Sequence, residues 1–147
     1  MSRIAKLLRS MVPGSYPKHR QTRERNCVQT VVAIALGRDV DEVEERAGTD
    51  GDLTVSETLD LLDAYGVTCR PISARLVADF WPSFYARSGG ARLRGLAFRL
   101  PAEGEDVGHA YYVHGKRIYD PATGRERSVD PSALKTLDWL AILPEMP

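Results

Sequence analysis

The order of the helical and strand patterns predicts an α+β fold with an antiparallel sheet. Three helical patterns follow one another in the first half of the chain, before any strong strand pattern begins. The later strand candidates are joined by connections of hairpin length, whereas a parallel sheet needs longer crossovers. The 147 residues, of which 43% are apolar and 27% charged, match one ordinary globular domain.

Residues 1–19 are predicted to form a basic amphipathic helix and a linker, ahead of a main domain at residues 20–147. The apolar face of this helix consists of four side chains at helical spacing: Ile4, Leu7, Leu8 and Met11. Pro13 and Gly14 end the helix. We expect it to pack on its own domain, with contact to a partner or to a membrane surface as the alternatives.

Charge is balanced overall but strongly segregated along the chain. Residues 1–25 carry seven basic side chains against one acidic side chain, a net charge of +6, and residues 38–63 carry ten carboxylates against two arginines, a net charge of −8. We expect the two segments to lie against each other or to be solvated separately. Nucleic acid is not an expected partner, because there is no basic domain, no RNP-like or helix-turn-helix signature and no aromatic interleaving among these arginines.

Residues 27–36 are predicted to form a central, buried helix. They are apolar on nearly every face, which is typical of a helix inside a core. Asn26 and Gln29 have the spacing of a capping box, and Gly37 is suited to end the helix. The helix is therefore expected to begin at Cys27.

Two more helices follow, each with a predicted cap at its start and a glycine at its end. The first is acidic, begins after Asp39 and ends at Gly48. The second begins with a capping box formed by Thr54 and Glu57 and stops at Gly66. Its buried stripe is expected to contain four apolar residues: Val55, Leu59, Leu61 and Leu62.

The rest of the chain is predicted to contain short strands and short helices. Residues 67–72 alternate apolar and polar positions, which predicts a strand that Pro71 breaks. Residues 75–87 predict one or two short helices interrupted at Pro82, and a further short helix begins at Pro131. Four further strands are expected, at residues 93–100, 108–113, 117–120 and 139–143.

The two cysteines differ in their predicted surroundings. Cys27 lies in the first turn of the buried helix, where free N–H groups and the positive end of the helix dipole stabilise a thiolate. A small buried apolar residue is the alternative role for it. Cys69, in the strand before Pro71, is expected to be a buried, inert thiol that is not bonded to Cys27. Two cysteines and three histidines exclude a thiolate zinc cluster and a disulfide scaffold, so we expect no metal and no cofactor.

His109 is the predicted partner of Cys27, and Asp120 is the predicted partner of His109. A two-residue turn at 114–115 places His109 directly opposite Asp120, whereas a turn at 115–116 makes the two residues diagonal neighbours on the same face. A three-residue loop would separate them. An imidazole beside a carboxylate favours the protonated state, which suits pairing with a thiolate. A surface ion pair across a hairpin is the structural alternative.

Gln21 lies six residues before Cys27, in the segment that leads into the helix. From there a side-chain amide can reach over the nucleophile and, with the backbone N–H of Cys27, hold the oxyanion of a tetrahedral intermediate. The other two histidines have no predicted role. His114 falls in the turn, where solvent is expected to surround it, and His19 falls in the linker.

Together these residues resemble the papain-like cysteine hydrolases, and within them the small bacterial C39-like peptidases and the papain-fold deamidase domains of bacterial toxins and effectors. The matching stretches, over about residues 20–143, are Gln21, Asn26-Cys27-Val28, Gly108-His109-Ala110 and Tyr119-Asp120-Pro121-Ala122-Thr123-Gly124. The resemblance implies a single papain-like (C39-like) domain whose nucleophile helix packs on the antiparallel sheet. It also implies four roles: Cys27 as nucleophile, His109 as general base and acid, Asp120 as the residue orienting His109, and Gln21 as oxyanion donor.

The activity that the resemblance implies is acyl transfer through a thioester. A cysteine peptidase that cleaves a peptide or isopeptide bond in a protein or peptide substrate is favoured. A glutamine deamidase of the same fold is the first alternative, and a non-catalytic binding or structural module is the second. The apolar runs are too short to span a bilayer and no secretory signal is recognised. A cytoplasmic location is therefore expected, with delivery as an effector as the alternative.

Overall fold

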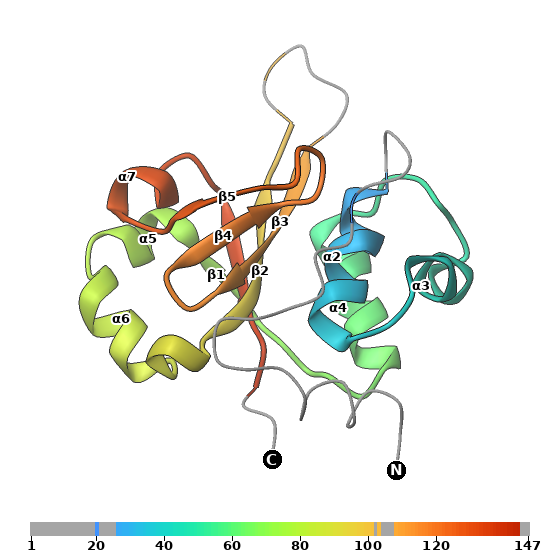
Figure 1. The fold of residues 1–147 in the computed structure, drawn as a ribbon, viewed down its shortest axis with the longest axis horizontal. Coiled ribbons are helices and arrows are strands. Elements are labelled where there is room, and N and C mark those ends of the chain that lie inside the picture. The colour runs from blue at the N-terminus through green and yellow to red at the C-terminus, as the bar shows by residue number, and fades with distance from the viewer. Residues whose placement is uncertain (1–19, 21–25, 102, 104–107, 145–147) are drawn as a thin grey trace.

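The computed structural model describes residues 20, 26–101, 103 and 108–144, in which a six-stranded sheet lies between two groups of helices (Figure 1). The helices are α2 (Cys27–Leu36), α3 (Val40–Ala47), α4 (Val55–Ala64), α5 (Ala74–Ala78), α6 (Trp81–Arg87) and α7 (Pro131–Leu134), with a 3-10 turn, η1 (Gly90–Arg92). The strands are β1 (Pro71–Ser73), β2 (Arg94–Arg99), β3 (His109–His114), β4 (Arg117–Asp120), β5 (Arg125–Ser128) and β6 (Trp139–Ile142). The predicted α+β class is confirmed.

The sheet is antiparallel throughout, as predicted, with the strand order β1-β6-β2-β3-β4-β5. Strands β2 to β5 follow one another in sequence and in space. The last strand, β6, instead pairs between β1 and β2. This insertion brings Trp139, near the end of the chain, beside Phe98 at the far end of β2.

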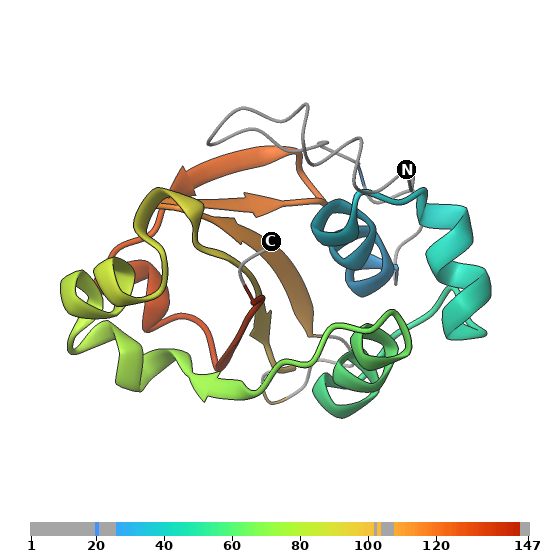
Figure 2. The same ribbon diagram turned by 90° about the horizontal axis from the view of Figure 1, so that it is seen from below.

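The two faces of the sheet carry two separate cores (Figure 2). Side chains alternate between the faces along β2, because successive residues of a strand point to opposite sides. Leu96 and Phe98 belong to the core under α2, α3 and α4, whereas Ala97 belongs to the core under α5, α6 and α7. Helix α2 therefore packs directly against the sheet, as predicted.

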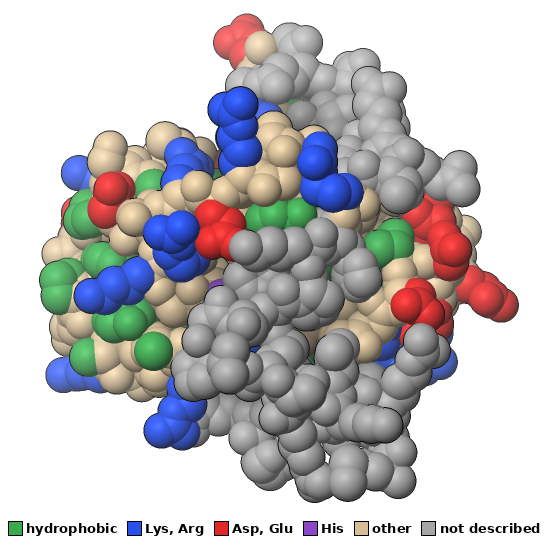
Figure 3. Space-filling model, in the orientation of Figure 1, with side chains coloured by type: hydrophobic (Ala, Val, Ile, Leu, Met, Phe, Trp, Pro, Cys, Tyr) green, Lys and Arg blue, Asp and Glu red, His purple; other side chains and the backbone are tan. Residues whose placement is uncertain are grey.

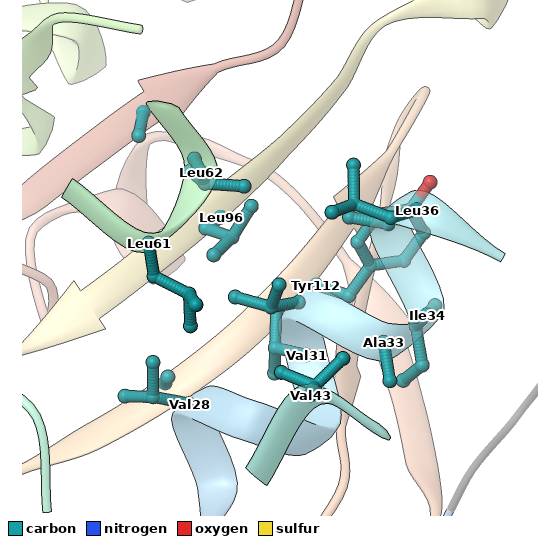
Figure 4. Packing of buried hydrophobic residues seen from close by; sticks show 14 of the residues in the cluster. Val28, Val31, Ala33, Ile34, Leu36, Val43, Leu61, Leu62, Leu96 and Tyr112 are labelled. Atoms are coloured by element: carbon teal, nitrogen blue, oxygen red, sulfur yellow. The ribbon is translucent and has the colours of Figure 1, made fainter. Parts of the chain in front are cut away.

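The core around α2 is the one that positions the candidate site. All ten residues of α2 are buried, which confirms the prediction drawn from its apolar composition. Figure 4 shows its apolar side chains beside Val43 of α3 and Leu61 and Leu62 of α4, with Leu96 and Tyr112 of the sheet nearby. Burial of one valine, leucine or isoleucine side chain contributes about 1.5–3 kcal/mol to the free energy of folding, so packing fixes the position of α2 on the sheet.

The helix ends test the predicted caps. The Thr54–Glu57 capping box is present in full, and Gly37 and Gly48 end their helices in the left-handed conformation. The capping box at Asn26 is wrong, because the Asn26 side chain donates to Glu44 instead and makes no cap hydrogen bond. Asp39 stands at the cap position of α3, but its side chain accepts no cap hydrogen bond.

Some of the predicted element boundaries are wrong. Residues 67–70 form no strand, and Pro71 begins β1 instead of breaking it. Strand β1 lies at the edge of the sheet, where the missing N–H of a first-position proline is tolerated. Pro82 lies in the first turn of α6, so the break between α5 and α6 precedes it. In α4, two residues of the predicted buried stripe, Val55 and Leu59, are only partly buried.

Two features of the β3–β5 region also differ from the prediction. Strand β5 was not expected, because its sequence Arg-Glu-Arg-Ser contains no apolar residue. His114 is the last residue of β3 and is buried, not solvated in the turn. Burial and the nearby charge of Arg94 lower the pKa of His114, so its imidazole is neutral at neutral pH.

A group of exposed acidic side chains lies over α3 (Figure 3). The predicted helix within residues 1–19 lies outside the described residues, so its contact with this acidic surface stays a prediction. No helix in the described part of the chain is both long enough and apolar enough to cross a bilayer.

Candidate active site

Cys27 is the first residue of α2 and is buried in the core between α2 and the sheet. Two neighbouring side chains fix the helix start. The Asn26 amide donates to Glu44 of α3 at 2.8 Å, and the Gln29 amide donates to the carbonyl oxygens of Thr49 and Gly51 at 3.1 and 2.7 Å. The sulfur therefore begins a helix whose position is set by packing and by three long-range hydrogen bonds.

His109 is the first residue of β3, on the strand that packs against α2. Its imidazole and the ring of Tyr111 are nearly perpendicular, in a T-shaped contact with the two centroids 4.6 Å apart. Gly108, directly before it, has no room for a side chain, because a Cβ there would lie 2.3 Å from the carbonyl oxygen of Arg99. Glycine at this position allows β3 to approach the end of β2 beside the imidazole.

Asp120 is the last residue of β4, and its Oδ1 lies 2.6 Å from Nε2 of His109. The observed pairs, Tyr112 with Tyr119 and His114 with Arg117, correspond to a turn at 115–116. The two residues are therefore diagonal neighbours, and the alternative register with a turn at 114–115 is wrong.

The electrostatics of this pair favour an imidazolium beside a carboxylate. Burial alone would lower the pKa of His109, but hydrogen bonds with Asp120 and Cys27, together with the charges of both, raise it to about 9. Burial would raise the pKa of Asp120, but hydrogen bonds from His109 and from the backbone N–H of Ala122 hold it below its usual value of 3.8. Since Nε2 faces Asp120, Nδ1 is the ring nitrogen that remains for Cys27.

A cavity of about 480 Å³ opens beside Cys27 and His109. One wall comes from residues 52–56, which lead into α4, and the other from the end of β2 and from Trp139 of β6. Its lining is predominantly apolar and includes Val28, Leu53, Val55, Phe98, Leu100, Pro101 and Trp139. Such a cavity suits an apolar group of a ligand whose polar part reaches the cysteine and the histidine.

The structure thus brings together three of the four residues predicted for the site. The fourth, Gln21, lies outside the described residues. Cys69 is a free thiol, as is Cys27, but it is only partly buried and lies in a loop; burial raises its pKa. Among the described residues, no three His, Cys, Asp or Glu side chains gather in a way that could hold a metal ion.

Two parts of the site were missed by the sequence reasoning. The walls of the cavity, residues 52–56 and Trp139, come from segments that only the sheet topology brings together. The turn after Asp120 holds the carboxylate through the backbone N–H of Ala122, 2.9 Å from Oδ1. The Asp-Pro-Ala-Thr-Gly sequence there is typical of a turn and was the available signal.

The fold is similar to that of two solved peptidase-domain structures. The structure matches the peptidase domain of Streptococcus ComA, a bifunctional ABC transporter involved in a quorum sensing pathway, with a TM-score of 0.62 and 17% sequence identity over 86% of this chain and 97% of that chain. It also matches the peptidase domain of Streptococcus mutans ComA, with a TM-score of 0.58 and 18% identity over 86% of this chain and 98% of that chain. No protein-family model and no curated protein matches the sequence. The similarity confirms the predicted fold.

Proposed function

We propose that the chain is a papain-like cysteine peptidase in which Cys27 is the nucleophile, His109 the general base and acid, and Asp120 the residue that orients His109. The observation that carries this proposal is that the His109 imidazole interacts with both Cys27 and Asp120, beside an apolar cavity. An ion pair that only stabilised the hairpin would need no thiol at a helix start beside the imidazole. The peptidase domains that share the fold support the same activity.

The first half of the reaction is acylation. The Cys27 thiolate attacks the carbonyl carbon of the scissile bond, and the imidazolium of His109 gives its proton to the departing amine. The C–N bond breaks and a thioester remains on Cys27. The Asp120 carboxylate holds the imidazole in place and stabilises its positive charge, without taking the proton itself.

The second half is hydrolysis of the thioester. Neutral His109 takes a proton from a water molecule, which attacks the thioester carbonyl and releases the acid and the Cys27 thiolate. The oxyanion formed in each half is stabilised by the backbone N–H of Cys27 and by the side-chain amide of Gln21. We assign this activity to residues 20–147 and assign residues 1–19 to contact with the domain or with a partner.

The cavity supports a peptide substrate with a large apolar side chain near the scissile bond. The volume of about 480 Å³ and the lining by Leu53, Phe98 and Trp139 favour an aliphatic or aromatic group. Hydrolysis of a glutamine side-chain amide uses the same attack geometry. The apolar lining favours the peptidase over the deamidase, because a primary amide in this cavity would lose hydrogen bonds to water.

The nucleophile is tested by thiol labelling. We expect iodoacetamide to label Cys27 faster than Cys69 near pH 6, because Cys27 lies at a helix start beside the His109 imidazole, whereas burial raises the pKa of Cys69. Mass spectrometry of the two cysteine-containing peptides gives both rates in one sample. Equal, slow labelling of both cysteines would contradict the proposal.

The reaction is tested with a mixture of peptides of varied sequence. We expect new peptide termini next to sites with a nearby apolar residue, and no products from the Cys27→Ala variant. Cys69→Ala is the matched control, and it should retain the activity. Conversion of glutamine to glutamate without chain cleavage would identify the deamidase instead.

A further inference from the structure

An arginine from the beginning of the described chain holds the turn that follows Asp120. Arg20 donates from Nε to the carbonyl oxygen of Pro121 at 3.4 Å and from Nη2 to the carbonyl oxygen of Ala122 at 3.2 Å. The guanidinium is a planar fork with several N–H donors, so one side chain can hold two successive carbonyl groups. This contact joins segments 102 residues apart in the sequence.

Ala122 connects this contact to the candidate active site. Its backbone N–H donates to Oδ1 of Asp120 at 2.9 Å, and the same oxygen lies 2.6 Å from Nε2 of His109. The N–H of Gly124 also donates to the carbonyl oxygen of Asp120, at 2.8 Å. The position of the carboxylate therefore depends on the conformation of residues 121–124.

Gly124 provides the space in which the arginine lies. Its φ of 73° is in the left-handed region, which glycine adopts without strain. A Cβ on Gly124 would come 2.8 Å from Nη1, 2.9 Å from Cδ and 3.1 Å from Cζ of Arg20. The arginine thus lies across the glycine at the place where a side chain would be.

We propose that Arg20 is a positioning residue that, by holding the carbonyl groups of Pro121 and Ala122, keeps the Ala122 N–H on the Asp120 carboxylate and the carboxylate on His109. Its importance for catalysis rests on the proposed function. Its effect on His109 does not, because that effect is measurable without any substrate.

The first test is an NMR titration of the His109 imidazole. Among the described residues, the titratable groups that face this ring are Cys27 from α2, Asp120 from β4 and Tyr111 from its own strand. Loss of the Arg20 contact should let the carboxylate move away, so Arg20→Ala should lower the pKa of His109 by about 0.5–1 unit, a fraction of the 1–3 units that an opposite charge contributes. Loss of a nearby positive charge alone would raise this pKa, so the sign of the shift separates the two effects.

Arg125→Ala is the matched control, because Arg125 begins β5 at the other end of the same turn. It removes an equal charge and leaves the two carbonyl contacts intact, so it should not lower the pKa of His109. Arg20→Lys should give an intermediate shift, since an ammonium group lacks the planar fork.

Gly124→Ala provides a second, independent route to the same result. The added methyl group displaces Arg20, so the pKa of His109 should fall in this variant as well. The strain of an alanine at this positive φ is common to both backgrounds, so the fall in the pKa of His109 caused by Gly124→Ala should be larger in the wild type than in the Arg20→Ala background, where the displaced atoms are absent. This variant and Arg20→Lys test the inference even where Arg20→Ala does not fold.

The inference is overturned when the arginine variants leave the pKa of His109 unchanged or raise it, or when Arg125→Ala lowers it equally. Cys27 labelling by iodoacetamide in the same variants separates this result from the proposed function. A wild-type protein whose Cys27 reacts no faster than Cys69 contradicts the peptidase proposal, and the titration still decides the role of Arg20.

Discussion

The two sides of the candidate site are held in place in different ways. Cys27 begins a fully buried helix, which Asn26 and Gln29 tie to the segments beside it. His109 and Asp120 lie at the ends of two strands and are only partly buried. Their arrangement depends on one hairpin and on the turn at residues 121–124. Changes near the helix should therefore affect stability first, and changes near the hairpin should affect activity first.

The largest expected effect is the loss of His109, the residue that transfers protons in both halves of the proposed reaction. His109→Ala should lower turnover on the order of 10⁴-fold or more, because no described group replaces it. Peptide cleavage by the purified variant measures this loss. His114→Ala is the matched control: it removes the buried histidine at the other end of β3 and should lower the melting temperature without abolishing cleavage.

The next largest effect is expected when Asp120 loses the charge that orients His109. Asp120→Asn should lower kcat by about 10³–10⁴-fold and leave a weak residual activity, since the imidazole still exchanges protons but loses its orientation and the stabilisation of its charge. A kcat equal to that of the wild type would show that the hairpin pair is only structural.

The ion pair of His109 and Asp120 predicts how the free energy of unfolding depends on pH. The raised pKa of His109 contributes stability that is fully present below its ordinary value of 6.5 and is lost as the pH rises through about 9. The lowered pKa of Asp120 contributes stability that is present above its ordinary value of 3.8 and is lost on further acidification. Urea unfolding of wild type and Asp120→Ala should therefore differ most between about pH 4 and 6.5 and less at pH 9. A difference that grew toward pH 9 would contradict the ion pair.

Gln21 is expected to act mainly in the transition state. Gln21→Ala should lower kcat by about 10²–10³-fold and leave KM nearly unchanged, as removal of one oxyanion donor does. Steady-state kinetics on a good peptide substrate separate the two constants. Full kcat in this variant would mean that the resemblance to papain-like enzymes extends only to the nucleophile and its base.

The helix that carries Cys27 was predictable, because its apolar run and Gly37 are local signals. The sequence pattern alone allowed two registers of the β3–β4 hairpin, although Gly115 was a local signal for one of them. Gly115 has a φ of 59° and no described non-glycine residue has a positive φ, which fits glycine at the first position of a two-residue turn. A turn at 114–115 would have required a positive φ at His114, at a steric cost.

Other parts of the site depend on contacts that no local pattern contains. Strand β5 is held by backbone pairing with β4 at the exposed edge, so its polar sequence gives no alternation to detect. Trp139 reaches the cavity only because β6 inserts between β1 and β2. The contact of Arg20 with Ala122 likewise becomes visible only when distant segments are placed side by side.

The smallest effect is expected from a change in α2, the helix that begins with Cys27. Gln29→Met keeps an unbranched side chain of similar size but removes the two hydrogen bonds to the carbonyl oxygens of Thr49 and Gly51. Each such bond contributes about 0.5–1.5 kcal/mol. The Oε1 atom of Gln29 is buried without a hydrogen-bond partner among the described residues, so its removal offsets part of the loss. We expect the free energy of unfolding to fall by about 1–2 kcal/mol in urea titrations.

Thr54→Ala provides the scale for this measurement, because it removes one helix cap in the same region at a cost of about 1 kcal/mol. Both variants should label Cys27 at nearly the wild-type rate, since the packing of α2 still holds the sulfur beside His109. A Gln29→Met protein with normal stability and strongly reduced Cys27 labelling would reverse the comparison. The hydrogen bonds at the helix start would then position the nucleophile directly, as the turn after Asp120 is proposed to position the histidine.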